Sequence, residues 1–241
     1  MKLHGSKKRN QALTLVEVVA VIAVLVLLVI VFSPALNPLN RRPNEVSCAG
    51  LVRQIGLSFQ VWGGDHGDKL PMEVSVVNGG AKESVAGGNA AAVFQVISNE
   101  LTDPRILHCP RDTEHSVFPL APGPQFLGSI ATNFSGDLKN HISYFIGLDA
   151  SANHPDALLS GDDNFGIGSS PAKSGLLEIP ANAPIDWTSA RHTTYKRYIW
   201  DVRTSYGNVC LADGSVQQTT GSSLTSLLRA TGLATNRLAI P

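Results

Sequence analysis

The longest apolar run of the chain lies near its N-terminus. Over residues 13–32, Thr14 and Glu17 are the only polar side chains. At about 1.5 Å per residue, a helix over this run is about 30 Å long, which matches the hydrocarbon thickness of a bilayer. The preceding residues 1–12 carry four basic side chains and no acidic one. This charge pattern predicts a cytoplasmic N-terminus, with the rest of the chain on the extracytoplasmic side.

A second helix is predicted over residues 44–62. Its apolar residues recur at spacings of three and four and therefore share one helix face. They are Cys48, Val52, Ile55, Phe59 and Trp62. We expect this face to pack against the sheet of the globular head. Three prolines within residues 33–43 predict a break between the two helices, because proline interrupts the helical hydrogen-bond ladder.

The remaining chain alternates short strand-like and helix-like patterns. Strands are predicted at residues 72–77 and 142–148, and a hairpin at 206–212 and 215–219 around Asp213-Gly214. Asn89 is the expected N-cap of a helix that runs to about Leu101, and Ser222 or Ser223 that of a last helix.

Composition and charge exclude two classes of protein. The 241 residues include 19 Lys+Arg and 19 Asp+Glu, so the net charge is zero and no nucleic-acid partner is expected. Hydrophobic residues make up 43% and charged residues 16% of the chain, which excludes wholesale disorder.

Glu17 separates three interpretations of the N-terminus. A secretory signal peptide and a plain signal anchor both fit the basic leader and the apolar run. Neither has a use for a carboxylate inside the apolar segment, where it costs a few kcal/mol unless it is partnered. A prepilin-type leader is the third interpretation, and it does use such an acid.

The segment A-L-T-L-V-E-V-V at residues 12–19 resembles the processing site of type IV prepilins. The resemblance implies cleavage between Ala12 and Leu13 by prepilin peptidase, N-methylation of Leu13, and Glu17 at the fifth mature position. The family usually has Gly before the cut and Phe after it, where this chain has Ala12 and Leu13. In a filament, Glu17 would pair with the free amine of a neighbouring subunit and fix the axial offset between subunits.

Further segments resemble pseudopilin-like proteins with large heads. They include residues 95–101, 106–112, 144–149 and 207–216. Many members of this group carry a His ten residues before the Asp of the final Asp-Gly. Here Arg203 stands at that position.

This resemblance implies an α+β, pilin-like fold, with a long N-terminal membrane and spine helix packed on a mainly antiparallel β-sheet head with additional short helices. The implied domains are a cleaved leader at 1–12, a transmembrane and polymerisation helix with a proline-rich break at 13–43, and an extracytoplasmic head at 44–241. The implied localisation is the bacterial inner membrane, crossed once with the head in the periplasm, followed by a periplasmic or surface filament.

The implied function is a structural subunit of a type II secretion pseudopilus. A type IV pilin for adhesion, motility or DNA uptake is the alternative, and a membrane-anchored binding module or an enzyme are the remaining classes. The implied partners are prepilin peptidase, other pilin or pseudopilin subunits in a homopolymer or mixed filament, the inner-membrane secretion platform and the lipid bilayer. The sequence contains no GxSxG, HExxH, P-loop or complete GxGxxG motif, and no enzymatic activity is expected.

The cysteines and acidic turns carry the remaining candidate chemistry. In an oxidising compartment, Cys48 and Cys109 are the expected disulfide pair, and Cys109 with Cys210 is the alternative. Residues 108–115 hold His, Cys and Asp side chains without the usual spacing of zinc ligands. Major pseudopilins commonly hold calcium, for which Asp162, Asp163 and Asp213 are candidate ligands. The calcium-loop pattern is absent, so a solvated turn is expected there.

Aromatic and basic residues also gather between residues 187 and 200. They are Trp187, Arg191, Tyr195, Lys196, Arg197, Tyr198 and Trp200. Exposed side chains of these types bind glycans or single strands. Strand residues of a sheet with one solvated face are the expected explanation.

Overall fold

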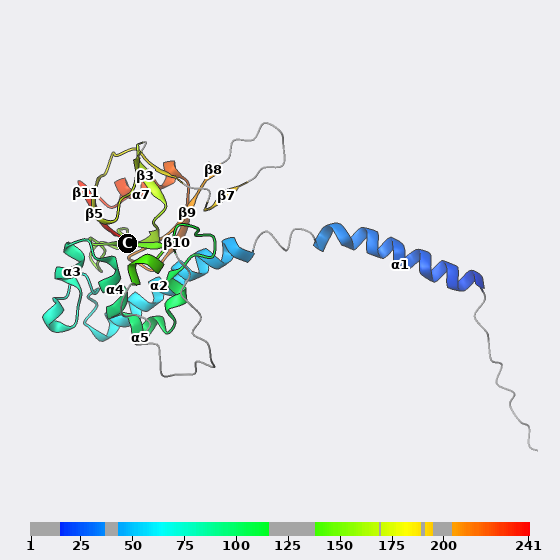
Figure 1. The fold of residues 1–241 in the computed structure, drawn as a ribbon, viewed down its shortest axis with the longest axis horizontal. Coiled ribbons are helices and arrows are strands. Elements are labelled where there is room, and N and C mark those ends of the chain that lie inside the picture. Colours follow the sequence, from blue (N-terminus) through cyan, green and yellow to red (C-terminus); the bar gives the residue numbers. More distant parts are fainter. Residues whose placement is uncertain (1–14, 37–42, 116–137, 169, 189–190, 195–203) are drawn as a thin grey trace, which may run out of the picture. The chain divides into compact units, whose positions relative to one another are not determined.

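The computed structural model of the protein describes residues 15–36, 43–115, 138–168, 170–188, 191–194 and 204–241. The chain divides into two compact units, Met1–Pro43 and Asn44–Pro241. The first unit contains helix α1, and the second contains a folded head with the remaining helices and strands (Figure 1).

Helix α1 spans Leu15–Leu36, and its side chains are described from residue 15 to residue 28. Within the described residues, no helix combines the length and the apolarity needed to cross a membrane. The expected fold with a long membrane and spine helix, and the expected single-pass inner-membrane localisation, are therefore wrong.

Helix α2 spans Pro43–Asp65 and is separate from α1. The predicted apolar stripe is confirmed, because its five residues from Cys48 to Trp62 are at most 3% exposed. The opposite face carries Leu57 and Val61, which are 53% and 58% exposed. Residues 37–42, where part of the predicted proline break falls, lie outside the described residues, and α1 continues past Pro34.

The head has an α+β fold built on antiparallel sheets. A six-stranded sheet has the order β10-β9-β2-β1-β11-β5, and each pair of neighbours is antiparallel. Its strands are β1 (Tyr144–Gly147), β2 (Leu158–Asp162), β5 (Gly175–Pro180), β9 (Gly207–Leu211), β10 (Val216–Thr219) and β11 (Thr235–Ile240). The smaller sheets contain β3 (Phe165–Ile167), β4 (Ser170–Pro171) and β6 (Ile185–Trp187), and the pair β7 (Thr193–Thr194) and β8 (Thr204–Ser205).

Two buried clusters cover the two faces of the six-stranded sheet. Successive strand residues point to opposite faces, so Tyr144 and Ile146 pack with α2 and α4, whereas Phe145 packs with Trp187 of β6 and Leu224 of α7. Figure 1 shows α3, α4 and α5 gathered on one side of the sheet and α7 with β3 on the other. These helices are α3 (Lys82–Ala86), α4 (Ala90–Val96), α5 (Ser98–Leu101) and α7 (Gly221–Ala230).

Short 3-10 helices complete the described elements. They are η2 (Val76–Asn78), η3 (Pro104–Leu107) and η4 (Leu138–His141). The strand predicted at residues 72–77 is wrong. The chain turns there, because the Glu73 carboxylate accepts a hydrogen bond from the Leu70 amide at 2.8 Å and Ser75 caps η2.

Most other local predictions are confirmed. The strand predicted at 142–148 is β1, and the hairpin around Asp213-Gly214 is β9 and β10. Asn89 caps α4 by accepting a hydrogen bond from the Ala92 amide. The helix is shorter than predicted because it breaks at Ile97 before α5 begins. Thr220 caps the last helix, two residues earlier than predicted.

Candidate functional site

Three side chains that could bind a metal or react with one another meet inside the head. Cys48 of α2, Cys109 after η3 and His192 before β7 are all 0% exposed. Their sulfur and ring nitrogen atoms lie within 4.8 Å of one another. The Cys48 and Cys109 Sγ atoms are 2.6 Å apart, and His192 Nε2 lies 3.6 Å from Cys109 Sγ. We call these three residues the Cys–His centre.

The surrounding fold fixes each member of the Cys–His centre. The stripe of α2 turns Cys48 toward the sheet. The Cys109 amide donates to Ser143 Oγ at 3.0 Å, and the Ser143 amide donates to the Leu107 carbonyl, so Ser143, the residue before β1, holds the loop that carries Cys109. The His192 carbonyl accepts from the Tyr206 amide at 3.1 Å, and the two rings stack 5.3 Å apart.

Asp162 supplies a negative charge beside the Cys–His centre. Its Oδ2 lies 3.3 Å from His192 Nε2, and accepts hydrogen bonds from the Asn208 amide at 2.7 Å and from Asn208 Nδ2 at 3.0 Å. Burial by itself lowers the pKa of His192. The hydrogen bonds to Asp162 and Cys109 outweigh it and raise that pKa to about 9. His192 is therefore positively charged at neutral pH and forms a buried ion pair with Asp162.

The spacing of the sulfur atoms limits what the Cys–His centre can do. Two thiolates on a tetrahedral zinc ion lie about 3.8 Å apart, given Zn–S bonds of about 2.3 Å. A disulfide requires about 2.05 Å. The Cys48 and Cys109 Sγ atoms are 2.6 Å apart, so they would have to move less to form a disulfide than to bind a zinc ion together. All three cysteines of the chain are thiols in the structure, so the Cys48–Cys109 bond stays a prediction, although the two side chains are in contact.

Arg191 organises a second polar cluster next to the first. Its Nη1 donates to Asp163 Oδ1 at 2.7 Å, and its Nη2 lies 2.9 Å from Asp112 Oδ2. His115 Nδ1 also contacts Asp112 Oδ2, at 2.8 Å. Burial by itself raises the pKa of Asp112, but His115 and Arg191 outweigh it and hold that pKa well below its usual range.

The described residues therefore contain two groups that could hold a metal ion, the Cys–His centre and the group of Asp112, His115 and Asp163. The second group already has a cation, since the Arg191 guanidinium lies between its two carboxylates. A metal ion bound there would have to displace or repel that charge.

The three candidate calcium ligands contact three different partners. Asp162 pairs with His192, and Asp163 pairs with Arg191. The Asp213 carboxylate accepts from the Ser215 amide at 2.8 Å and caps its own turn. The prediction of a solvated turn fits Asp213, whereas Asp162 and Asp163 are buried.

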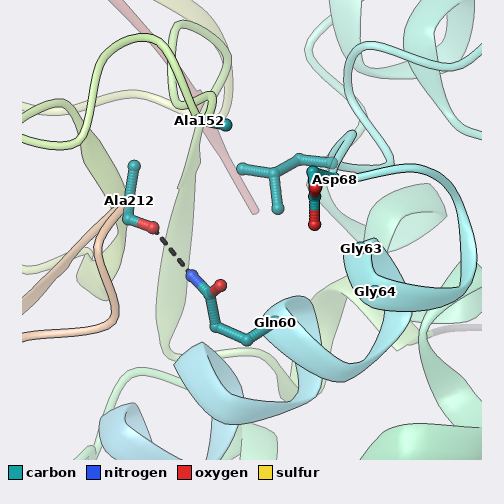
Figure 2. Close-up of a pocket in the computed structure, with 7 residues that line it drawn as sticks. Gln60, Gly63, Gly64, Asp68, Ala152 and Ala212 are labelled. Carbon is teal, nitrogen blue, oxygen red and sulfur yellow. Dashed lines mark hydrogen bonds between the residues drawn. The ribbon is translucent and has the colours of Figure 1, made fainter.

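A small cavity lies between α2 and the end of β9. Its volume is about 170 Å³, and Gln60, Asp68 and Ala212 are among its lining residues. Figure 2 shows the Gln60 amide pointing from α2 to the Ala212 carbonyl, to which it donates at 2.7 Å. Ligand pockets usually measure about 300–1,000 Å³, so this cavity is too small for a typical small-molecule site.

The remaining predicted site residues fall in three places. Ala12 and Leu13, the predicted processing site, lie outside the described residues. Glu17 lies in the first turn of α1 and is exposed. In the aromatic and basic segment, Trp187 and Arg191 are buried, and positions 195–200 lie outside the described residues.

Sequence reasoning missed His192 and the role of Arg191. The position ten residues before Asp213 is Arg203, which lies outside the described residues. The ladder of β7 and β8 pairs Thr193 with Ser205, and so places His192 next to Tyr206, the residue before β9.

Comparison with known proteins adds no assignment. The chain matches no protein-family model, no curated protein and no solved structure.

Proposed function

We propose that the protein is a structural subunit of a type II secretion pseudopilus, cut by prepilin peptidase between Ala12 and Leu13 and polymerised through α1. The observation that supports this proposal most strongly is the surface of α1. Its large apolar side chains between residues 15 and 28 are exposed in every direction, from 43% at Leu28 to 81% at Leu15.

A helix that is apolar all round needs an apolar environment, since each exposed large side chain loses about 1.5–3 kcal/mol that burial would provide. Other copies of α1 are the proposed environment. Parallel packing of such helices would bury the same surface on every subunit.

Glu17 gives the proposed packing its register. It lies in the first turn of α1, surrounded by apolar positions. Cleavage after Ala12 would create an amine at Leu13 of a neighbouring subunit, and that amine would pair with the Glu17 carboxylate. Buried ion pairs are best attested as devices that fix register, so the pair would set the axial offset between subunits.

The experiment compares Glu17→Ala with the wild type in cells that express prepilin peptidase. Filaments are sheared off and cross-linked, and polymer yield is normalised to total subunit. Glu178→Ala, which removes an exposed acid from the head, is the matched control. We expect the control to polymerise normally and Glu17→Ala to lose at least nine-tenths of the polymer while its subunit level is unchanged.

Normal polymer yield from Glu17→Ala would refute the assembly role of Glu17. Loss of the subunit itself would show that Glu17 serves stability, which would also contradict the proposal.

A further inference from the structure

We propose that Cys48 and Cys109 form a disulfide that acts as a mechanical staple at the point where the chain enters the head. The disulfide would transmit a pulling force on the N-terminal part of the chain directly to the loop that carries Cys109. The mechanical role rests on the proposed function, because only a filament subunit would be loaded this way. The bond itself does not depend on that function.

The contacts of the three cysteines select this pair. The Cys48 and Cys109 Sγ atoms are 2.6 Å apart, and both side chains are fully buried. Cys210 has different neighbours, because its thiol donates to its own strand at the Leu211 carbonyl and faces Gly56 of α2. The structure therefore favours Cys48–Cys109 over the alternative Cys109–Cys210 pair.

His192 does not change this choice. It is already paired with Asp162 at 3.3 Å, and the Asp162 charge would lose that partner if His192 bound a metal instead. Metal binding would also have to increase the distance between the two sulfur atoms by about 1 Å, inside a core where neither side chain is exposed.

Formation of the bond is a two-electron oxidation. Each thiol loses one proton and one electron, the two sulfur atoms join, and the disulfide of a thiol–disulfide oxidoreductase is reduced to two thiols. Because Cys48 and Cys109 are buried in the folded head, the exchange has to occur before the head closes around them.

The position of Cys48 gives the bond its mechanical effect. The head begins at Asn44, and Cys48 lies one helical turn further along. Without a bond, a pull at residue 44 would peel α2 off the sheet turn by turn, removing Val52, Ile55 and Phe59 from the core in sequence. With the bond, the load passes from Cys48 to Cys109, and residues 49–108 stay enclosed in a covalent loop.

Single-molecule stretching of the full chain tests both parts of the proposal. The two cysteines are 61 positions apart, so the bond should shorten the fully unfolded chain by about 220 Å at 3.6 Å per residue. We expect this shortening in the wild type and in the control Cys210→Ser. We expect it to be absent in Cys48→Ser/Cys109→Ser and after treatment of the unfolded wild type with dithiothreitol. The first unfolding event should need a higher force with the bond than without it.

Peptide mapping of the non-reduced wild type adds a measurement that does not require any variant to fold. A peptide that joins Cys48 to Cys109 is the expected result. Free thiols at both positions, a Cys109–Cys210 peptide, or stoichiometric zinc in protein with an unshortened chain would each overturn the proposal. Equal unfolding forces with and without the bond would overturn the mechanical role alone. None of these measurements uses filaments, so a failure of the staple is distinguishable from a failure of the pseudopilus function.

Discussion

His192 Nε2 lies 3.3 Å from Asp162 Oδ2, and both side chains are completely buried. The pair joins the loop before β7 to the end of β2. Removing one partner from a buried ion pair typically costs about 3–5 kcal/mol, because the other charge is left uncompensated. The contact therefore makes the stability of the head depend on pH.

Stability should fall as pH rises past the ordinary pKa of histidine. The pKa of His192 is about 9 in the folded head and about 6.5 in an unfolded chain. A raised pKa means that the stabilisation is complete below about pH 6.5 and is lost as pH rises through about 9. Urea unfolding midpoints measured from pH 6 to 9.5 check this.

Asp162→Asn is the matched variant for the pH experiment. Without the carboxylate, burial dominates and lowers the pKa of His192, so stability should rise rather than fall between pH 5.5 and 7.5. A variant whose pH profile parallels that of the wild type would show that the Asp162–His192 pair does not control the profile.

Arg191→Met should destabilise the head by about 3–5 kcal/mol, because it removes the buried guanidinium that pairs with both the Asp112 and the Asp163 carboxylates. Arg229→Met, which removes an exposed cation from α7, should change stability by less than about 0.5 kcal/mol. Chemical denaturation measures both. Equal effects of the two substitutions would contradict the role assigned to Arg191.

The two faces of α2 should respond differently to truncation. Phe59 is 0% exposed and Leu57 is 53% exposed on the same helix. Phe59→Ala should cost about 3–5 kcal/mol through lost burial and a cavity, whereas Leu57→Ala should cost less than about 1 kcal/mol. Thermal unfolding of the two variants measures the difference, and a Leu57→Ala loss as large as that of Phe59→Ala would show that the outer face is covered in the folded chain.

Two glycines of α2 should respond in opposite directions. A Cβ at Gly56 would lie 2.5 Å from Cys210 Sγ, whereas a Cβ at Gly50 would meet nothing within 4 Å. Gly56→Ala should destabilise the head by about 1–3 kcal/mol through overpacking. Gly50→Ala should stabilise it by about 0.5–1 kcal/mol, because alanine is the better helix former. Denaturant titration of both variants gives the sign of each change in stability. A Gly56→Ala variant as stable as the wild type would mean that α2 shifts easily against β9.

The parts of the fold that sequence predicted depend on local repetition. The stripe of α2 repeats over four turns, and Asp213-Gly214 marks the turn between β9 and β10, so both could be predicted. The predicted strand at residues 72–77 failed because the Glu73 and Ser75 side chains accept backbone hydrogen bonds that stabilise a turn, and such contacts leave no periodic signal.

The candidate site was only partly predictable because its contacts are long-range. Cys48 and Cys109 could be proposed as a pair from residue type. His192 and Asp162 are thirty positions apart and come together only because β2 pairs with β9 while Tyr206 holds His192. The membrane helix was predicted from the apolar run alone, and the described residues contain no helix that is long and apolar enough to cross a membrane.

Mass spectrometry of the protein's N-terminus tests the proposed function most directly. The full chain is expressed with and without an active prepilin peptidase, and its N-terminal peptide is sequenced. We predict that the peptidase removes residues 1–12 and leaves an N-methylated Leu13, and that the chain keeps its leader when the peptidase is inactive. An intact leader in the presence of active peptidase, or a cut near Ala35, would contradict it.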